Sequence, residues 1–125
     1  MPARNADVVP SSLTPPQASL IEPTAVIVHL LELVRIKVGD TVAVLGAGPI
    51  GLLAAILARY AGASRVIIAD RVGHRLQLAR RLGIDAAVDT SRQSVVEAVM
   101  DLTAGRGADV IIDAARILEK DHPEI

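Results

Sequence analysis

One glycine-rich loop, Gly46-Ala47-Gly48-Pro49-Ile50-Gly51, constrains the fold of this chain more than any other segment. It follows directly after a short apolar run, Thr41 to Leu45, and directly precedes an apolar segment of helix length. In a GxGxxG loop between a strand and a helix, the first glycine permits a tight turn. The second lets a phosphate group approach the backbone, and the third lets helix and strand pack closely. The free N–H groups and the dipole of the helix N-terminus then face an anion. An ordinary glycine-rich turn is the alternative, so the surrounding pattern has to decide.

Four short apolar runs, most of them rich in β-branched residues, alternate with segments of helix length. The predicted strands are Thr41 to Leu45, Arg65 to Ala69, Ala86 to Val88 and Asp109 to Ile112. The predicted crossover helices are Gly51 to Ala61, a segment with the apolar face Val72, Leu76, Ala79 and Leu82, and a segment with the stripe Val95, Val96, Val99 and Leu102. This alternation predicts the α/β class, with a Rossmann-type doubly wound parallel sheet in the order 3-2-1-4.

The residues before the first predicted strand form two segments. Residues 1 to 19 are rich in Pro, Ser and Thr, which indicates an extended or linker segment. A helix is predicted after Pro23 and ending near Gly39, with its buried side at Ala25, Val28, Leu31 and either Leu33 or Val34.

The second predicted strand leads into an acidic residue, Asp70, nineteen positions after Gly51. A carboxylate at this place accepts hydrogen bonds from the adenosine ribose hydroxyls of a dinucleotide, and it would repel the 2′-phosphate of NADP. We therefore expect a dinucleotide, with NAD favoured over NADP. Arg71 and Arg75 could bind a phosphate, which keeps NADP open, although a solvated helix face also explains such arginines. The predicted cofactor-binding residues are Gly46, Gly48, Pro49, Ile50, Gly51, Asp70, Arg71 and Arg75.

Composition excludes several other classes. The net charge is −1 and the arginines are dispersed, so no footprint for nucleic acid is visible. There is no cysteine, which excludes disulfides, thiolate zinc sites and a cysteine nucleophile. Residues 41 to 58 carry no charge, but their central glycines divide them into a strand-like and a helix-like run, so a membrane span is not expected. We also expect no signal peptide, and a cytoplasmic location.

A family resemblance rests on five segments in the expected order: Leu20-Ile21-Glu22-Pro23, Val38 to Val42, Gly46 to Gly51, Gly62 to Ile67 and Gly105 to Asp113. Together they resemble the cofactor domain of zinc-dependent medium-chain alcohol dehydrogenases, in the branch of sorbitol (polyol) and threonine dehydrogenases. The resemblance covers about residues 8 to 115. It implies a domain that holds NAD while a separate catalytic domain, with zinc bound by Cys, His and Glu, presents an alcohol for hydride transfer.

The zinc ligands of that family are not found in this sequence. By resemblance, Glu22 would lie beside the catalytic zinc, but a catalytic site needs about three protein ligands. His29, His74 and His122 belong to no ligand motif. We therefore expect no bound zinc, assign no catalytic residue and leave open whether this chain alone is an enzyme.

The carboxyl end also departs from the family pattern. After Asp113 the family continues with a loop against the nicotinamide, a helix and two more strands, whereas residues 116 to 125 do not match that pattern. The expected division is a linker and remnant of a domain junction at 1–23, a dinucleotide-binding domain at 24–115 with an incomplete second half, and an atypical tail at 116–125. A gene fragment, a frameshifted product or an excised domain would each account for this.

Two functions follow as hypotheses. The first is an NAD(H)-binding domain of a zinc-dependent alcohol, polyol or threonine dehydrogenase, inactive alone and completed by a missing catalytic domain. The second is a non-enzymatic nucleotide-binding or interaction module, which self-associates through the free edge of the fourth strand. A methyltransferase fits the loop spacing less well.

Overall fold

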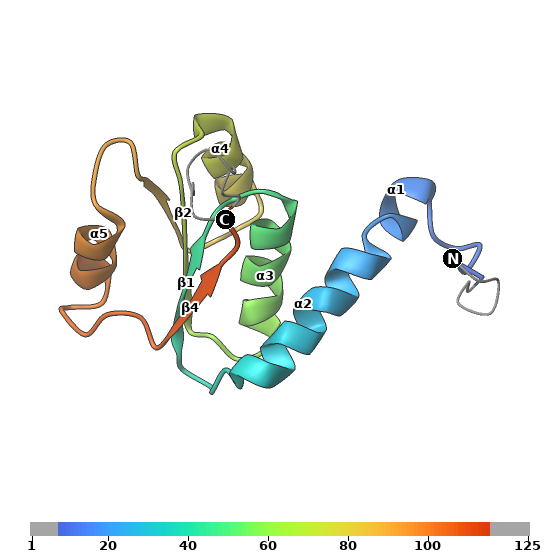
Figure 1. The fold of residues 1–125 in the computed structure, drawn as a ribbon, viewed down its shortest axis with the longest axis horizontal. Coiled ribbons are helices and arrows are strands. Elements are labelled where there is room, and N and C mark those ends of the chain that lie inside the picture. Colours follow the sequence, from blue (N-terminus) through green and yellow to red (C-terminus); the bar gives the residue numbers. More distant parts are fainter. Residues whose placement is uncertain (1–7, 116–125) are drawn as a thin grey trace, which may run out of the picture.

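The computed structural model describes residues 8 to 115 of the chain (Figure 1). Within this range the elements are α1 (Pro15–Ala18), α2 (Ile21–Val34), β1 (Thr41–Leu45), α3 (Pro49–Tyr60), β2 (Arg65–Asp70), α4 (Gly73–Arg81), β3 (Ala86–Asp89), α5 (Val95–Leu102) and β4 (Val110–Asp113). The four strands form one parallel sheet in the order β3-β2-β1-β4. The predicted α/β class, doubly wound parallel sheet and strand order are confirmed. The proposed tail at 116–125 and His122 lie outside the described residues.

The central strand, β1, sets the register of the sheet. Val42 lies opposite Val66 on β2 and opposite Val110 on β4. Three strands, β2, β3 and β4, extend one residue further than predicted, to Asp70, Asp89 and Asp113. Asp70 and Asp89 lie opposite each other, and Asp113 lies opposite Leu45 of β1. Three carboxylates therefore lie at the carboxyl edge of the sheet, where the loops that follow parallel strands meet.

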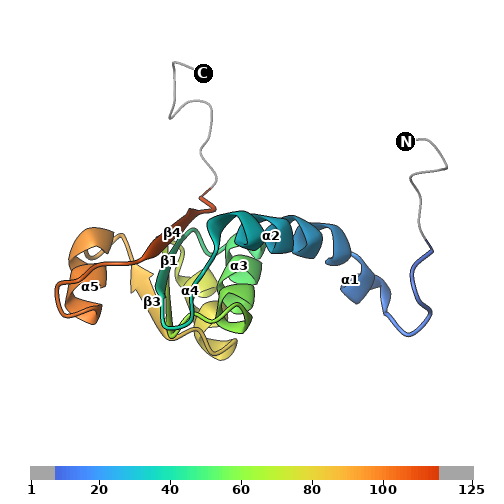
Figure 2. The same ribbon diagram turned by 90° about the horizontal axis from the view of Figure 1, so that it is seen from below.

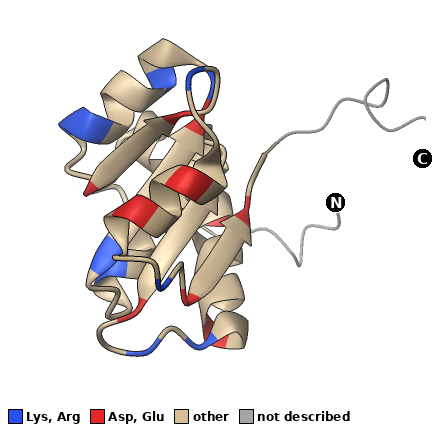
Figure 3. Ribbon diagram, turned by 90° about the vertical axis from the view of Figure 1, so that its left-hand side faces the viewer, with Lys and Arg blue, Asp and Glu red and all other residues tan. Residues whose placement is uncertain are grey.

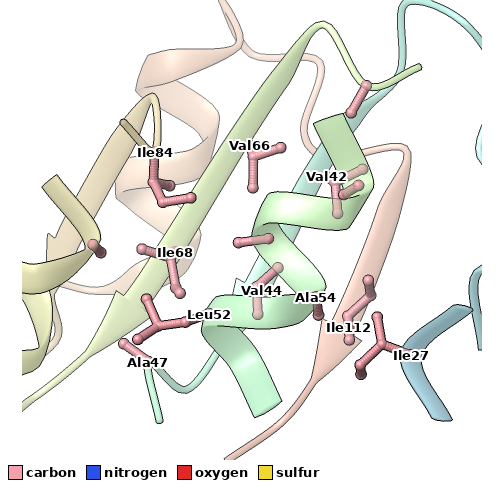
Figure 4. Packing of buried hydrophobic residues seen from close by; sticks show 14 residues of the cluster. Ile27, Val42, Val44, Ala47, Leu52, Ala54, Val66, Ile68, Ile84 and Ile112 are labelled. Atoms are coloured by element: carbon pink, nitrogen blue, oxygen red, sulfur yellow. The ribbon is translucent and has the colours of Figure 1, made fainter. Parts of the chain in front are cut away.

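Helices cover both faces of the sheet, but unequally. The α2, α3 and α4 helices lie on one side and α5 alone on the other (Figure 2). Successive residues of a strand point to opposite faces, so Val42 and Val44 pack toward α3 while Ala43 packs toward α5. Figure 4 shows valine and isoleucine side chains of the sheet beneath α3. The side of α3 that meets the sheet carries alanines with no exposed surface, which bring the helix close to the strands: Ala54, Ala55 and Ala58.

The N-terminal segments differ from the prediction. The expected extended region contains the short helix α1, which a reciprocal capping box between Thr14 and Gln17 stabilises. The next helix begins at Ile21, before Pro23, because proline in the first helical turn requires no hydrogen-bond donor. It ends at Val34, with Arg35 in the left-handed conformation (φ 58°), and not near Gly39.

The predicted helix faces are correct only in part: Leu76, Ala79 and Val99 are buried as expected, and other predicted core residues are not. The buried residue of α2 is Ile27, with Leu30 and Leu31 packed beside it. The predicted core residues that are exposed instead are Ala25, Val28 and Leu33 in α2, Leu82 after α4, and Val96 and Leu102 in α5. The residues of α2 are apolar on most sides of the helix. Sequence periodicity therefore did not identify the narrow strip that contacts α3.

The charge-free stretch 41–58 divides into β1 and α3, as predicted. A different segment, Pro15–Val34, is long and apolar enough to cross a membrane by length and composition alone. Signal sequences and core helices meet the same criteria, so this is weak evidence for a membrane span.

Candidate functional site at the carboxyl edge of the sheet

Two of the three loop glycines are required by the chain's own packing. Gly46 has a φ of +102°, and its N–H donates to the carbonyl oxygen of Ala69 at 2.7 Å. A Cβ on Gly46 would come within 2.8 Å of the carbonyl oxygen of Ala114. A Cβ on Gly51 would lie 1.8 Å from the carbonyl oxygen of Gly46. The turn and the start of α3 therefore pack too closely for any side chain at either position.

The middle glycine has a different environment. Gly48 adopts φ −75° and ψ −175°, a conformation open to other residues, and a Cβ there would meet nothing within 4 Å. It is also the N-cap of α3, whose first turn, Pro49 and Ile50, receives no side-chain cap. Uncapped N–H groups and a positive dipole end thus face open space. Such a helix start attracts anions, and a side chain at Gly48 would occupy part of the open space beside it.

The carboxylate of Asp70 joins the loops that follow β1 and β2. Its Oδ2 accepts a hydrogen bond from the N–H of Ala47 at 2.8 Å, and its Oδ1 accepts one from the N–H of Val72 at 2.9 Å. Nη1 of Arg75 lies 3.6 Å from Oδ2. Burial of Asp70 opposes ionisation, but the backbone hydrogen bonds and the nearby charge of Arg75 outweigh it, so the pKa of Asp70 is lowered. The group carries a negative charge at neutral pH.

A cavity of about 530 Å³ opens at this edge of the sheet. Of the predicted site residues, it brings together Gly46, Asp70, Arg71 and Arg75, while Gly48, Pro49, Ile50 and Gly51 form the adjoining start of α3. The remaining lining residues are Leu45, Ala69, Val72, Thr90, Val95 and Ala115. None of these six was among the predicted site residues. Thr90, Val95 and Ala115 follow β3 and β4, so the predicted strand order indicates that they lie at this edge, whereas only the packing shows that they line the cavity.

The charges near this cavity have both signs. Its lining contains Asp70, Arg71 and Arg75. Figure 3 shows further basic residues on α4 and acidic residues on α5, which do not line it. Arg75, on α4, is half-exposed while Asp70 beside it is nearly buried. A ligand entering the cavity would therefore meet a half-exposed cation and a nearly buried carboxylate.

The residues that the structure describes do not fit a zinc site. Within residues 8–115 no group of three His, Cys, Asp or Glu side chains could hold a metal ion. Glu22 is exposed in the first turn of α2 and does not line the cavity. His29, on the same helix, lies 4.0 Å from Glu32, and both side chains are largely exposed. No chemical step that requires a metal can be derived from these residues.

Comparisons with known proteins point to one family. The sequence profile of a family described as zinc-binding dehydrogenase matches residues 49–117. The chain is 41% identical over 110 residues to scyllo-inosose 3-dehydrogenase of Thermotoga maritima, covering 86% of this chain and 28% of that protein. It is 39% identical over 115 residues to L-threonine 3-dehydrogenase of Saccharopolyspora erythraea, covering 92% and 33%. The chain thus spans about a third of the length of these curated relatives.

Solved structures give the same result. One, described as a zinc-binding dehydrogenase from Sinorhizobium meliloti 1021 bound to NADP, superposes with a TM-score of 0.79 at 42% identity, covering 89% of this chain and 33% of that one. Another, an alcohol dehydrogenase from Escherichia coli CFT073 complexed with NADH, has a TM-score of 0.80 at 34% identity, covering 94% and 34%. Both named cofactors are nicotinamide dinucleotides.

Proposed function

Because this chain belongs to the zinc-binding dehydrogenase family, we propose that residues 24–115 bind NAD, as the cofactor domain of an enzyme that oxidises an alcohol, polyol or threonine. The observation that carries the proposal is the open space at Gly48 beside the uncapped start of α3. The turn at Gly48 would hold the pyrophosphate, and Asp70, which lines the adjoining cavity, would hold the adenosine ribose.

The preference for NAD over NADP rests on Asp70. Its ionised carboxylate accepts hydrogen bonds from ribose hydroxyls, whereas a 2′-phosphate would place like charges together. Arg71 and Arg75 line the same cavity and offset part of that repulsion. The two solved relatives named above carry NADP and NADH respectively, so both cofactors are compatible with this fold. We propose weaker binding of NADP, not its exclusion.

The proposed role of this chain is to bind and orient the dinucleotide. When bound, NAD accepts a hydride from the alcohol carbon. Substrate and metal must be held against the nicotinamide for that transfer, and residues 8–115 offer no ligand set for zinc. We therefore propose that the chain alone binds the cofactor without oxidising alcohols, and that a catalytic domain completes the enzyme. A cytoplasmic location is part of the proposal, since the cysteine-free composition suits a reducing compartment.

Parallel calorimetric titrations with NAD and NADP test this proposal on the wild type and on Gly48→Ala. The added methyl group meets no protein atom within 4 Å, so the variant folds normally but crowds the pyrophosphate. We expect at least tenfold weaker NAD binding, about 1.4 kcal/mol. Gly73→Ala is the matched control, because Gly73 also begins a helix, has no positive φ and has open space around its Cβ. Binding that is unaltered by Gly48→Ala, or absent from a folded wild type, would refute the proposal.

A second candidate, a self-associating nucleotide-binding module, is favoured by the edge of the sheet. Among the described strands β4 pairs only with β1. Ile111 on β4 is 66% exposed and borders an apolar groove of about 300 Å³ that Val96 and Met100 of α5 also line. An exposed apolar edge strand is a common site of pairing between chains.

Sedimentation measurements distinguish this second candidate. If the module self-associates, the wild type should form a dimer whose fraction rises with concentration. The variant Ile111→Lys should abolish the dimer and leave nucleotide binding intact. A wild type that stays monomeric across the concentration range would eliminate it without affecting the first proposal.

A further inference from the structure

The carboxylate of Asp70 accepts hydrogen bonds from both neighbouring loops. The N–H of Ala47, which donates to it, lies between Gly46 and Gly48, and the N–H of Val72 belongs to the loop that leads into α4. Both loops border the cavity at the carboxyl edge. By binding both loops, the carboxylate fixes the distance between them.

The turn after β1 has few other attachments to β2. One is the backbone hydrogen bond from Gly46 to Ala69 at 2.7 Å. The bond from Ala47 to Asp70 is the next along the chain, and it involves a charged acceptor whose side chain is only 8% exposed. Hydrogen bonds to ionised groups are stronger than neutral ones, and water competes poorly at a nearly buried acceptor. This bond is thus well suited to fix the orientation of the turn just before Gly48.

Binding of a ribose does not require these bonds to break. An ionised carboxylate has about four acceptor positions. The N–H groups of Ala47 and Val72 occupy one on each oxygen, and the N–H of Arg71 also stabilises the carboxylate, so at least one position remains. Arg75 Nη1, at 3.6 Å, is close enough for charge attraction but too distant for a hydrogen bond. Asp70 can hold the turn and accept ribose hydroxyls together.

We propose that Asp70 is a positioning residue for the phosphate-binding turn: its carboxylate orients the backbone from Gly46 to Gly48 and so strengthens binding of a diphosphate group that it does not touch. This inference rests on the proposed nucleotide-binding function, which it extends from recognition of the ribose to recognition of the phosphates.

Two probes separate positioning from direct contact, namely ADP and 2′,3′-dideoxy-ADP, which lacks both ribose hydroxyls. Titrations compare the wild type with Asp70→Ala, Asp70→Asn and the control Asp89→Ala. Asp89 lies opposite Asp70 in the sheet but accepts its hydrogen bonds from Ser91, not from the glycine turn.

Positioning predicts that Asp70→Ala weakens binding of both probes by about tenfold or more, which corresponds to one hydrogen bond to a charged group. Asp70→Asn should have a smaller effect, because its carboxamide oxygen can still accept one N–H. Asp89→Ala should bind both probes as the wild type does. Dideoxy-ADP binding that Asp70→Ala leaves unchanged, while ADP binding weakens, would overturn the proposal in favour of ribose contact alone.

Amide hydrogen exchange supplies a readout that needs no ligand. We expect faster exchange at Ala47 in Asp70→Asn and faster still in Asp70→Ala, with Ile112 in the neighbouring strand unaffected. If the alanine variant fails to fold, the asparagine variant still provides the comparison. Unaltered exchange at Ala47 in a folded variant would overturn the positioning role. If the folded wild type binds neither probe, the proposed function fails, whereas exchange at Ala47 still tests the contact.

Discussion

At the scale of single residues, the three glycines of the loop are glycine for different physical reasons. At Gly46 and Gly51, backbone conformation or close packing excludes any side chain. At Gly48, no neighbouring atom among the described residues does so. We expect Gly51→Ala to lower the free energy of unfolding by about 3 kcal/mol, the upper range for overpacking. Gly48→Ala should lower it by only about 1 kcal/mol, because alanine is a poorer N-cap than glycine but meets no neighbouring atom. Urea denaturation measures both, and equal losses would contradict this distinction.

Asp70 also predicts a pH dependence. The pKa of Asp70 is lower in the folded state than in the unfolded state. Ionised Asp70 therefore stabilises the fold above the pKa of the unfolded state, about 3.9. This stabilisation is lost as the pH falls through the pKa of the folded state. The pKa values of Asp85 and Asp89 are lowered too, so acidification alone would not isolate Asp70. Melting temperatures of the wild type and Asp70→Asn, measured from pH 7 to pH 3, should differ most at neutral pH and converge in acid. A constant difference would show that the charge of Asp70 is not involved.

At the scale of elements, α2 shows how the presence of a helix can be predicted while its bounds and its buried face are not. Ile27 is 1% exposed, while its neighbour Val28 is 44% exposed. Truncating a buried isoleucine costs about 2–5 kcal/mol, so Ile27→Ala should destabilise the chain by that amount. Val28→Ala should have little effect. Thermal or urea unfolding of the pair tests the orientation of α2, and a larger loss for Val28→Ala would reverse it.

At the scale of the whole molecule, the proposed cofactor cavity lies at one edge of the sheet, and one face of the sheet is covered by a single helix. Ligand binding to the folded state should therefore be visible as global stabilisation. NAD at about 100 times its dissociation constant would add about 2.7 kcal/mol. For a domain of this size that raises the melting temperature by roughly 10 °C or more. Calorimetry with and without NAD measures the shift, and Gly48→Ala should reduce it at the same NAD concentration. An NAD-independent melting temperature would contradict cofactor binding.

The sequence by itself determined the alternation of strands and helices, the parallel sheet and the glycine turn at the start of α3. These features depend on short-range properties: apolar runs of strand length, glycines at fixed offsets and the handedness of crossovers. The same properties indicated Asp70, because the end of a strand is visible in the chain itself.

Only the tertiary structure decided which helix faces are buried and which residues share the cavity. The rotation of α2 depends on its contact with α3, which no periodicity within a mostly apolar helix specifies. Thr90, Val95 and Ala115 reach the cavity because separate strands end at the same edge. The bond between Asp70 and Ala47 joins residues 23 positions apart, and it forms because β1 and β2 are paired in register. Such contacts follow from how the elements pack, and local sequence does not contain that information.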